Sequence, residues 1–404
     1  MNIRAMRFID RLAGIPLCFL FSVADFPARI INAGRKQKKT APEKILFIKL
    51  SELGAIVLAY PLLNKIKKEY PSTEMFFLTF SKNRDIFKIL GNIIPDKNIF
   101  VIREDSIFLL ALDTMAIIRR IRKERMDIVF DLEFFSRFTA ILAYLSGSKK
   151  SAGYYRYTFE NLYRGNMLTH RFQYNPFLHI SKSYLSLFQT IETSKKLTLA
   201  LERKIGDAEI GLQRFLSEIK IKDRLRERLK RYGAYEGEKL VLINPGEELL
   251  PLREWPIGNF ITLCKVLSEH AAVRMVFVGT KKASKKTEEV CAAIKNKNCI
   301  DFTAKTTLDE LLELFNMSDA LIANDCGLAH LAAFTPIKKF IFFGPESPAV
   351  FGPLGNNNTF IYSGFPCSPC LSAFNHRDSL CSDNKCLKSI SPEAVYDLLK
   401  PVLC

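Results

Sequence analysis

Four residues that could do chemistry stand close together in the second half of the chain: Asp325, Cys326, Gly327 and His330. Short apolar runs flank them, and the segment after Gly327 consists of small residues that favour a helix. This order predicts a buried strand, a tight turn, a helix and a second parallel strand. The first backbone N–H groups of such a helix would bind a phosphate group, because they lie at the positive end of the helix dipole.

The two polar side chains of this turn each have two interpretations. Asp325 suits either a helix cap or an acceptor for a ligand hydroxyl group. His330 lies about one turn into the predicted helix, from where it could reach the same ligand. Alternatively, Asp325 only caps the helix and His330 is a core histidine that is bonded within the protein.

The chain as a whole predicts two domains that could hold such turns. Its 404 residues are more than one domain with a single hydrophobic core ordinarily contains. Apolar runs alternate with helical segments from position 43 onwards, which predicts an α/β fold with doubly wound parallel sheets. We expect an N-terminal domain at 43–205, a helical linker at 206–235 and a C-terminal domain at 236–404. The first apolar run is not followed by Gly-x-Gly-x-x-Gly, which disfavours a nicotinamide-dependent oxidoreductase.

Two stretches within this frame lack a strand-and-helix pattern. Residues 147–185 are rich in Tyr, Arg, Asn and Gly without a clear period, so we expect a long loop that offers aromatic and basic side chains to sugar rings and phosphates or, alternatively, to single-stranded nucleic acid. Residues 206–233 are charged and carry apolar positions at helical spacing, which predicts an amphipathic helix that ends at Gly233.

Residues 1–42 form a basic and apolar segment. The apolar run at 15–23 is too short to span a bilayer, and no convincing signal-peptide cleavage site follows it. We expect the segment to lie in an anionic membrane surface; alternatively, it is a helix docked on the protein's own core. Lys and Arg outnumber Asp and Glu by 59 to 42, which favours anionic partners without choosing between lipids, phosphorylated sugars and nucleic acid.

The turn at 325–330, an apolar run after it and then Phe343-Gly344-Pro345 together resemble the donor-binding signature of glycosyltransferase family 9, the lipopolysaccharide heptosyltransferases and their relatives. Family members usually have Thr where this chain has Cys326. The resemblance implies a GT-B architecture, in which two Rossmann-like domains face a cleft. A nucleotide-sugar donor is then expected on the C-terminal domain and the acceptor on the N-terminal domain.

The same resemblance implies an activity and a location. The activity is inverting, metal-independent transfer of a heptose or related sugar to a lipopolysaccharide-type or other lipid-linked saccharide. Such an enzyme is expected to be cytoplasmic and peripheral on the inner face of the bacterial inner membrane. We expect no nucleic acid as partner, since the sequence carries no recognised nucleic-acid motif; binding driven by charge alone is the last of the alternatives.

The catalytic base of the family has no direct match. A Gly-Asp pair after the first strand commonly supplies it, whereas this chain has Gly54-Ala55. We expect Glu52 or Glu133 to replace it, because both follow predicted strands at their carboxyl ends, where ligands of such sheets gather. Alternatively, both are exposed loop carboxylates or helix-start charges, and the chain is a catalytically impaired protein that binds nucleotide sugars.

The resemblance also assigns residues to the donor. Arg253, beside a Trp-Pro step, matches a basic residue that contacts the donor phosphate, and a guanidinium group fits phosphate oxygens in a bidentate way. Asn244 ends the first predicted strand of the C-terminal domain and Gly246 follows it, and Lys281 stands where the family often has a Glu that holds the nucleoside. Alternatively, Arg253 is a surface residue without a ligand. The nucleotide base and the sugar are left open.

Four cysteines near the end of the chain, Cys367, Cys370, Cys381 and Cys386, have a spacing that suits a tetrahedral structural zinc ion. A related Cys tail occurs in many family 9 proteins. Alternatively, these cysteines form disulfides or remain free thiols. We expect no cofactor for catalysis.

Overall fold

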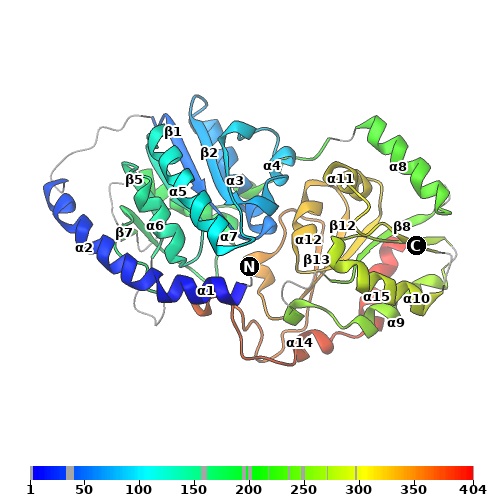
Figure 1. Ribbon diagram of the computed structural model, residues 1–404. Helices are drawn as coiled ribbons and strands as arrows, with labels where there is room; N and C mark the ends of the chain where they lie inside the picture. Colours follow the sequence, from blue (N-terminus) through cyan, green and yellow to red (C-terminus); the bar gives the residue numbers. More distant parts are fainter. Residues whose placement is uncertain are drawn as a thin grey trace. The chain divides into compact units, whose positions relative to one another are not determined.

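The computed structural model describes residues 3–32, 41–155, 162–192, 197–198, 203–216, 218–234, 237–246, 251–270, 272–295 and 298–403. The chain divides into two compact units, Met1–Ile210 and Gly211–Cys404. Each unit is built around its own parallel sheet with helices on it (Figure 1).

Unit 1 contains a sheet with the strand order β3-β2-β1-β4-β5-β6-β7, in which neighbouring strands are parallel. The sequence order reverses between β1 and β4. The strands are β1 (Lys44–Ile48), β2 (Glu74–Phe80), β3 (Ile99–Ile102), β4 (Ile128–Asp131), β5 (Lys150–Tyr155), β6 (His170–Gln173) and β7 (Leu197–Thr198). The helices are α1 (Ile3–Leu12), α2 (Gly14–Asn32), α3 (Leu53–Glu69), α4 (Ile86–Ile89), α5 (Ile107–Glu124), α6 (Arg137–Leu145) and α7 (Ile180–Glu192).

Alternate side chains along the strands of unit 1 meet different helices, because they point to opposite faces of the sheet. The face with Leu46 packs against α6 and against α5 through Ile117. On the other face, Phe47 stacks on Phe130 with ring centroids 5.5 Å apart, and Phe130 contacts Phe188 of α7 at 6.4 Å. Unit 1 is therefore doubly wound, as the sequence predicts.

Unit 2 contains a sheet with the strand order β10-β9-β8-β11-β12-β13, and its neighbouring strands are parallel too. The order reverses between β8 and β11. The strands are β8 (Lys239–Asn244), β9 (Val273–Phe277), β10 (Cys299–Asp301), β11 (Ala320–Asn324), β12 (Lys338–Phe343) and β13 (Asn358–Tyr362). The helices are α8 (Ile219–Arg231), α9 (Ile257–Ser268), α10 (Ser284–Ile294), α11 (Leu308–Asn316), α12 (Gly327–Leu331), α13 (Pro348–Phe351), α14 (Lys385–Lys388) and α15 (Pro392–Leu403).

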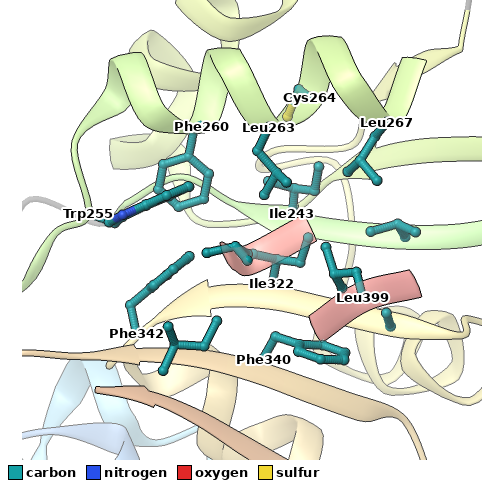
Figure 2. Close-up of a cluster of buried hydrophobic side chains, with 14 of the residues drawn as sticks. Ile243, Trp255, Phe260, Leu263, Cys264, Leu267, Ile322, Phe340, Phe342 and Leu399 are labelled. Atoms are coloured by element: carbon teal, nitrogen blue, oxygen red, sulfur yellow. The ribbon is translucent and has the colours of Figure 1, made fainter. Parts of the chain in front are cut away.

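A large apolar core of unit 2 lies between this sheet and the helices α9 and α15 (Figure 2). Trp255 stacks on Phe342 of β12 at 4.4 Å and meets Phe260 of α9 edge-on at 4.9 Å. Leu399 of α15 belongs to the same cluster. Trp255 is buried, so the segment that enters α9 is fixed to the sheet by a large aromatic side chain.

The prediction of a loop at 147–185 is wrong, because this stretch holds β5, β6 and the first residues of α7. Tyr154 and Tyr174 are buried and pack against Phe134, with ring centroids 5.4 and 5.1 Å apart. These aromatic side chains build the core of unit 1 and do not form a surface for an acceptor. Residues 156–161 lie outside the described residues.

The predicted helix at 206–233 forms only in its second half. Its described residues before α8 contain one 3-10 turn, Asp207–Ile210, and otherwise no regular structure. The backbone N–H of Phe215 donates to the carbonyl oxygen of Phe334 at 2.8 Å, so a contact within unit 2 replaces helical bonds there. Gly233 follows α8 with φ 83°, in agreement with the predicted helix stop.

Helices α1 and α2 are docked on unit 1, where α2 lies along α6 (Figure 1). Cys18 is buried in a small cluster with Ala140 and Met167. The inner side of this segment therefore packs on the protein, in agreement with the interpretation of a helix docked on the protein's own core. Its outer side is exposed. Within the described part of the chain, no helix combines the length and apolar character needed to cross a membrane.

Candidate active site

The reversals of strand order mark one edge of each sheet, because ligands of such sheets bind at the carboxyl ends of the strands beside the reversal. In unit 1 these ends are the turns after β1 and β4, and in unit 2 they are the turns after β8 and β11. Most predicted site residues end or follow these four strands: Glu52, Glu133, Asn244, Gly246 and the turn from Asp325 to His330. Each unit therefore gathers its predicted residues at the edge where a ligand is expected.

Arg253 and Asp325 are brought together although 72 positions separate them in the sequence. Nη1 of Arg253 lies 3.1 Å from Oδ2 of Asp325, and the side chains are only 13% and 5% exposed. Asp325 precedes Cys326, the N-cap of α12, so its carboxylate positions a guanidinium group and does not cap the helix. The pair fixes the guanidinium group of Arg253 beside the turn where the sequence predicts a phosphate group.

The position of Arg253 is fixed through its neighbour Trp255. The backbone N–H of Trp255 donates to Oδ1 of Asn324 at 2.8 Å, and its indole N–H donates to the carbonyl oxygen of Ile390 at 2.9 Å. Asn324 directly precedes Asp325, so a hydrogen bond joins the two segments next to the ion pair. Arg253 is thus held on both sides and is not a loose surface residue.

Gly246 allows a close contact that the sequence did not reveal. Its φ is 148°, and a Cβ atom there would lie 2.6 Å from Oε1 of Glu254 and 2.9 Å from Nζ of Lys286. Glu254 and Lys286 form an ion pair. Lys286 of α10 therefore borders the turn after β8, whereas Lys281 is exposed in the 3-10 turn Lys281–Ala283.

Asn244 has a structural contact at the same edge of the sheet. It is fully buried, and its Nδ2 donates to the carbonyl oxygen of Val278 at 2.9 Å. Gly279 passes so close that a Cβ atom there would lie 2.8 Å from Nδ2 of Asn244. The side chain ties the end of β8 to the end of β9.

A buried carboxylate in the turn after β12 was not predicted. Oε1 of Glu346 accepts a hydrogen bond from Nε of Arg377 at 2.6 Å, and the side chain is fully buried. Burial raises the pKa of Glu346; the positive charges of Arg377 and Arg253 act against this, and the negative charge of Asp325 adds to it. Glu346 is thus within electrostatic reach of the Arg253–Asp325 pair. An acidic residue directly after the Gly-Pro step was the available signal.

Helix α12 is short, with five residues from Gly327 to Leu331 before a 3-10 turn. A helix of this length has a small dipole, so an anion would be bound mainly by individual N–H groups and by Arg253. Cys326 packs against an apolar cluster that includes Ile341. His330 is buried on the helix, which agrees with either of its two interpretations.

Glu52 stands in an unusual backbone conformation in the turn between β1 and α3. Its φ is 63°, and Phe135 in the turn after β4 has φ 45°. Side chains with a Cβ atom rarely adopt positive φ, and such positions persist where the surroundings hold them, often at functional sites. Ala55 lies in the first turn of α3, where its N–H donates to the carbonyl oxygen of Glu52 at 3.1 Å.

Glu133 holds the turn that carries Glu52. Oε1 of Glu133 accepts the backbone N–H groups of Leu50 and Ser51, each at 2.9 Å, and the Ser51 hydroxyl at 3.0 Å. Its Oε2 lies 2.7 Å from Nζ of Lys49, and the two side chains are 11% and 3% exposed. Glu133 is therefore not an exposed loop carboxylate, and its oxygens already accept four hydrogen bonds.

The four cysteines of the predicted zinc site lie around one loop without forming a ligand set. Burial raises the pKa of Cys386, and the nearby Cys370, Cys367 and Cys381 would raise it further if they were ionised. Cys381 donates to the carbonyl oxygen of Asp383 at 3.2 Å. Among the described residues, which include all four cysteines, no three Cys, His, Asp or Glu side chains are placed to hold a metal ion.

The structural zinc ion thus stays a prediction. If it is correct, elemental analysis of protein purified without chelator should find one zinc per chain, and Cys370→Ser should abolish it, because tetrahedral zinc needs its four ligands. Buried Cys264 is the matched control, since it lies in the core of unit 2, and Cys264→Ala should retain the metal. Protein without zinc that titrates as free thiols would contradict the prediction.

Comparison with known proteins identifies the family of this chain. The model of glycosyltransferase family 9 (heptosyltransferase) matches residues 114–380, which is more than half of the chain. The chain belongs to glycosyltransferase family 9. This membership places it among the glycosyltransferases.

Two relatives of this family 9 chain are lipooligosaccharide heptosyltransferases 2. The protein from Haemophilus ducreyi is 25% identical over 326 residues, which cover 79% of this chain and 88% of the relative. The protein from Campylobacter jejuni is 25% identical over 170 residues, which cover 41% of this chain and 52%, about half, of the relative.

Two solved structures share the fold of this family 9 chain. E. coli ADP-heptose lipopolysaccharide heptosyltransferase II has a TM-score of 0.65 at 18% identity, with 89% of this chain and 98% of that chain covered. A family 9 glycosyltransferase from Veillonella parvula has a TM-score of 0.68 at 18% identity, with 89% and 97% covered. The two Rossmann-like units are therefore of the GT-B type.

Proposed function

We propose that this family 9 protein transfers a heptose or a related sugar from a nucleotide-sugar donor to a lipopolysaccharide-type or other lipid-linked saccharide. Transfer inverts the anomeric carbon and needs no metal ion. The observation that carries the proposal is the buried Arg253–Asp325 pair beside the turn after β11. A guanidinium group that is already fixed can bind a diphosphate and stabilise the charge that grows on it as the sugar leaves.

Glu52 is the general base in this mechanism. Its carboxylate accepts the proton of an acceptor hydroxyl while the hydroxyl oxygen forms a bond to the anomeric carbon. The bond from that carbon to the diphosphate oxygen breaks, and its electron pair leaves with the nucleoside diphosphate. Glu133 is a positioning residue, because its four hydrogen bonds keep its carboxylate in the β1–α3 turn.

The acceptor and the location belong to the same proposal. The relatives are named for sugar transfer to lipopolysaccharide or lipooligosaccharide, and an acceptor of that kind is held by a lipid in a membrane. We place the reaction at the inner face of the bacterial inner membrane, with the protein bound peripherally and no nucleic acid as partner.

The donor site is tested by calorimetric titration with ADP, UDP, GDP and their sugar derivatives. One nucleotide series should bind, and Arg253→Ala should weaken its binding by about 10- to 100-fold, since hydrogen bonds to charged groups contribute about 1.5–3 kcal/mol each. The change leaves Asp325 without its cation beside the phosphate, which adds repulsion.

Arg226→Ala is the matched control, because Arg226 is an exposed arginine on α8 whose loss changes the net charge equally. It should bind the nucleotide as the wild-type protein does. If neither the wild-type protein nor the control binds any of these nucleotides, the donor site is wrong. Binding without turnover on any lipid-linked acceptor would instead favour an impaired nucleotide-sugar-binding protein.

A further inference from the structure

The outer side of α1 and α2 exposes large apolar side chains. Six of them are between 56% and 66% exposed: Phe8, Leu12, Phe19, Leu20, Val23 and Phe26. Phe19, Val23 and Phe26 recur at the spacing i, i+4, i+7, so they form one stripe along α2. Soluble monomers rarely expose a contiguous apolar face of this kind unless it binds something.

The opposite side of the same helices is firmly attached to unit 1. The carboxylate of Asp10 accepts the backbone N–H groups of Arg137 and Phe138 at 3.0 and 2.8 Å, at the start of α6. Nη1 of Arg137 lies 3.2 Å from the same carboxylate. The apolar stripe is therefore held outward by an anchored segment and is not a core face that failed to pack.

Two glycines allow this attachment to be close. A Cβ atom at Gly14 would lie 2.7 Å from Cβ of Arg137. Gly165 has φ 75°, and a Cβ atom there would lie 2.8 Å from the carbonyl oxygen of Cys18. The hydroxyl of Ser22 accepts the N–H of Asn166 at 2.8 Å beside this contact. The docked orientation of α2 is thus specified by backbone contacts as well as by apolar packing.

A second exposed apolar stripe lies on α5. Phe108, Leu112 and Met115 are 70%, 41% and 48% exposed and follow the spacing i, i+4, i+7. Helices α5 and α6 cover the same face of the sheet, and α2 packs on α6. The outward stripes of α2 and α5 are therefore on the same side of that sheet.

We propose that the stripes of α1–α2 and α5 are a docking face for an anionic membrane surface, into which the apolar side chains insert while the helices stay docked on unit 1. Exposed cations on the same helices, Arg11 on α1 and Arg119 and Lys123 on α5, suit acidic headgroups. A second copy of the chain is a poorer occupant, since a symmetric dimer would bring these cations face to face.

The docking face deepens the proposed function, since it rests on a lipid-linked acceptor. Asp10 is bonded to the first residues of α6, and the turn before α6 carries Glu133, which holds the β1–α3 turn. The membrane side of unit 1 and the turn with the proposed base are therefore joined through one short segment. An acceptor could keep its lipid in the bilayer while its saccharide reaches this turn.

Cosedimentation with vesicles tests the docking face without any transfer reaction. The wild-type protein should bind vesicles of phosphatidylcholine mixed with phosphatidylglycerol, and bind less to phosphatidylcholine alone or at high salt. The variant Phe19→Ser/Leu20→Ser/Phe26→Ser should lose binding by about tenfold or more, because it removes three inserting side chains. Its nucleotide binding and its melting temperature should match those of the wild-type protein.

The matched control, Phe177→Ser/Leu216→Ser/Leu380→Ser, removes three apolar side chains elsewhere that are even more exposed, and it should still bind the vesicles. Equal binding by the α2 variant and the wild-type protein would overturn the docking face. A wild-type dimer that the α2 variant converts to a monomer, without vesicle binding by either, would assign the face to a second copy. Vesicle binding without nucleotide binding would support the face and contradict the donor site.

Discussion

Glu52→Gln should lower kcat for sugar transfer by about 10²- to 10⁴-fold, the usual contribution of a general base, while the affinity for the nucleotide stays unchanged. Glutamine has the shape of glutamate but does not accept a proton. Glu52 stands in the β1–α3 turn beside the reversal of strand order with φ 63°, and the N–H of the preceding residue, Ser51, donates to Glu133. Steady-state kinetics with saturating donor measures the change.

Two further variants show whether Glu52→Gln loses activity because the general base is absent or because the protein is unfolded. Glu52→Gly should lose activity equally while unfolding at the same or a higher temperature, because glycine adopts this φ without strain. Glu52→Gln/Ala55→Asp places a carboxylate in the first turn of α3, at the position of the family's usual base, and should regain part of the lost activity. Full activity of Glu52→Gln would show that another group accepts the proton.

The strands of unit 2 were predictable because they are short, continuous apolar runs between turns. The apolar runs on either side of the turn at 325–330 predict a buried strand and a second parallel strand, and these are β11 and β12. Both strands lie inside the sheet and are buried on both faces, so their composition alone carries the signal. The long helix α5 carries a comparable signal in its sequence, since its apolar positions repeat over several turns.

The missed elements of unit 1 lack that signal. β5 has the sequence Lys-Ser-Ala-Gly-Tyr-Tyr and β6 has His-Arg-Phe-Gln, so neither shows an apolar run or alternation. Their stability comes from neighbours that are distant in the sequence, such as Phe134 against Tyr154 and Tyr174. Aromatic residues among polar ones predict a surface, whereas tertiary packing places these side chains in the core.

The candidate site also depends on contacts between distant segments, which the sequence does not predict. The sequence identified Arg253 and Asp325 one at a time, and only the fold revealed that they form a pair. Glu346, which meets Arg377, was missed because its contact depends on how distant segments pack. The structural role of Glu133 in the β1–α3 turn could not be predicted from the sequence either, since its four donors lie 82 to 84 positions away along the chain.

Glu133→Leu should destabilise unit 1 by about 3–5 kcal/mol, the usual cost of removing one partner of a buried ion pair. It leaves the ammonium group of Lys49, 3% exposed, near the ring of Phe134 at 5.8 Å and without its carboxylate partner. The N–H groups of Leu50 and Ser51 lose their acceptor as well. Because the same turn carries the proposed base, kcat should fall too.

Removal of the other partner, Lys49, should lower the free energy of unfolding by less, so variants of this one pair test the role of Glu133. Lys49→Met leaves the Glu133 carboxylate with three donors, whereas Lys49→Met/Glu133→Leu removes both charges and should lie between the single variants. Circular dichroism follows chemical unfolding of both units, and the fluorescence of Trp255, the one tryptophan in the chain, follows unit 2. A larger loss of stability in Lys49→Met than in Glu133→Leu would show that the ammonium group, and not the carboxylate, organises this turn.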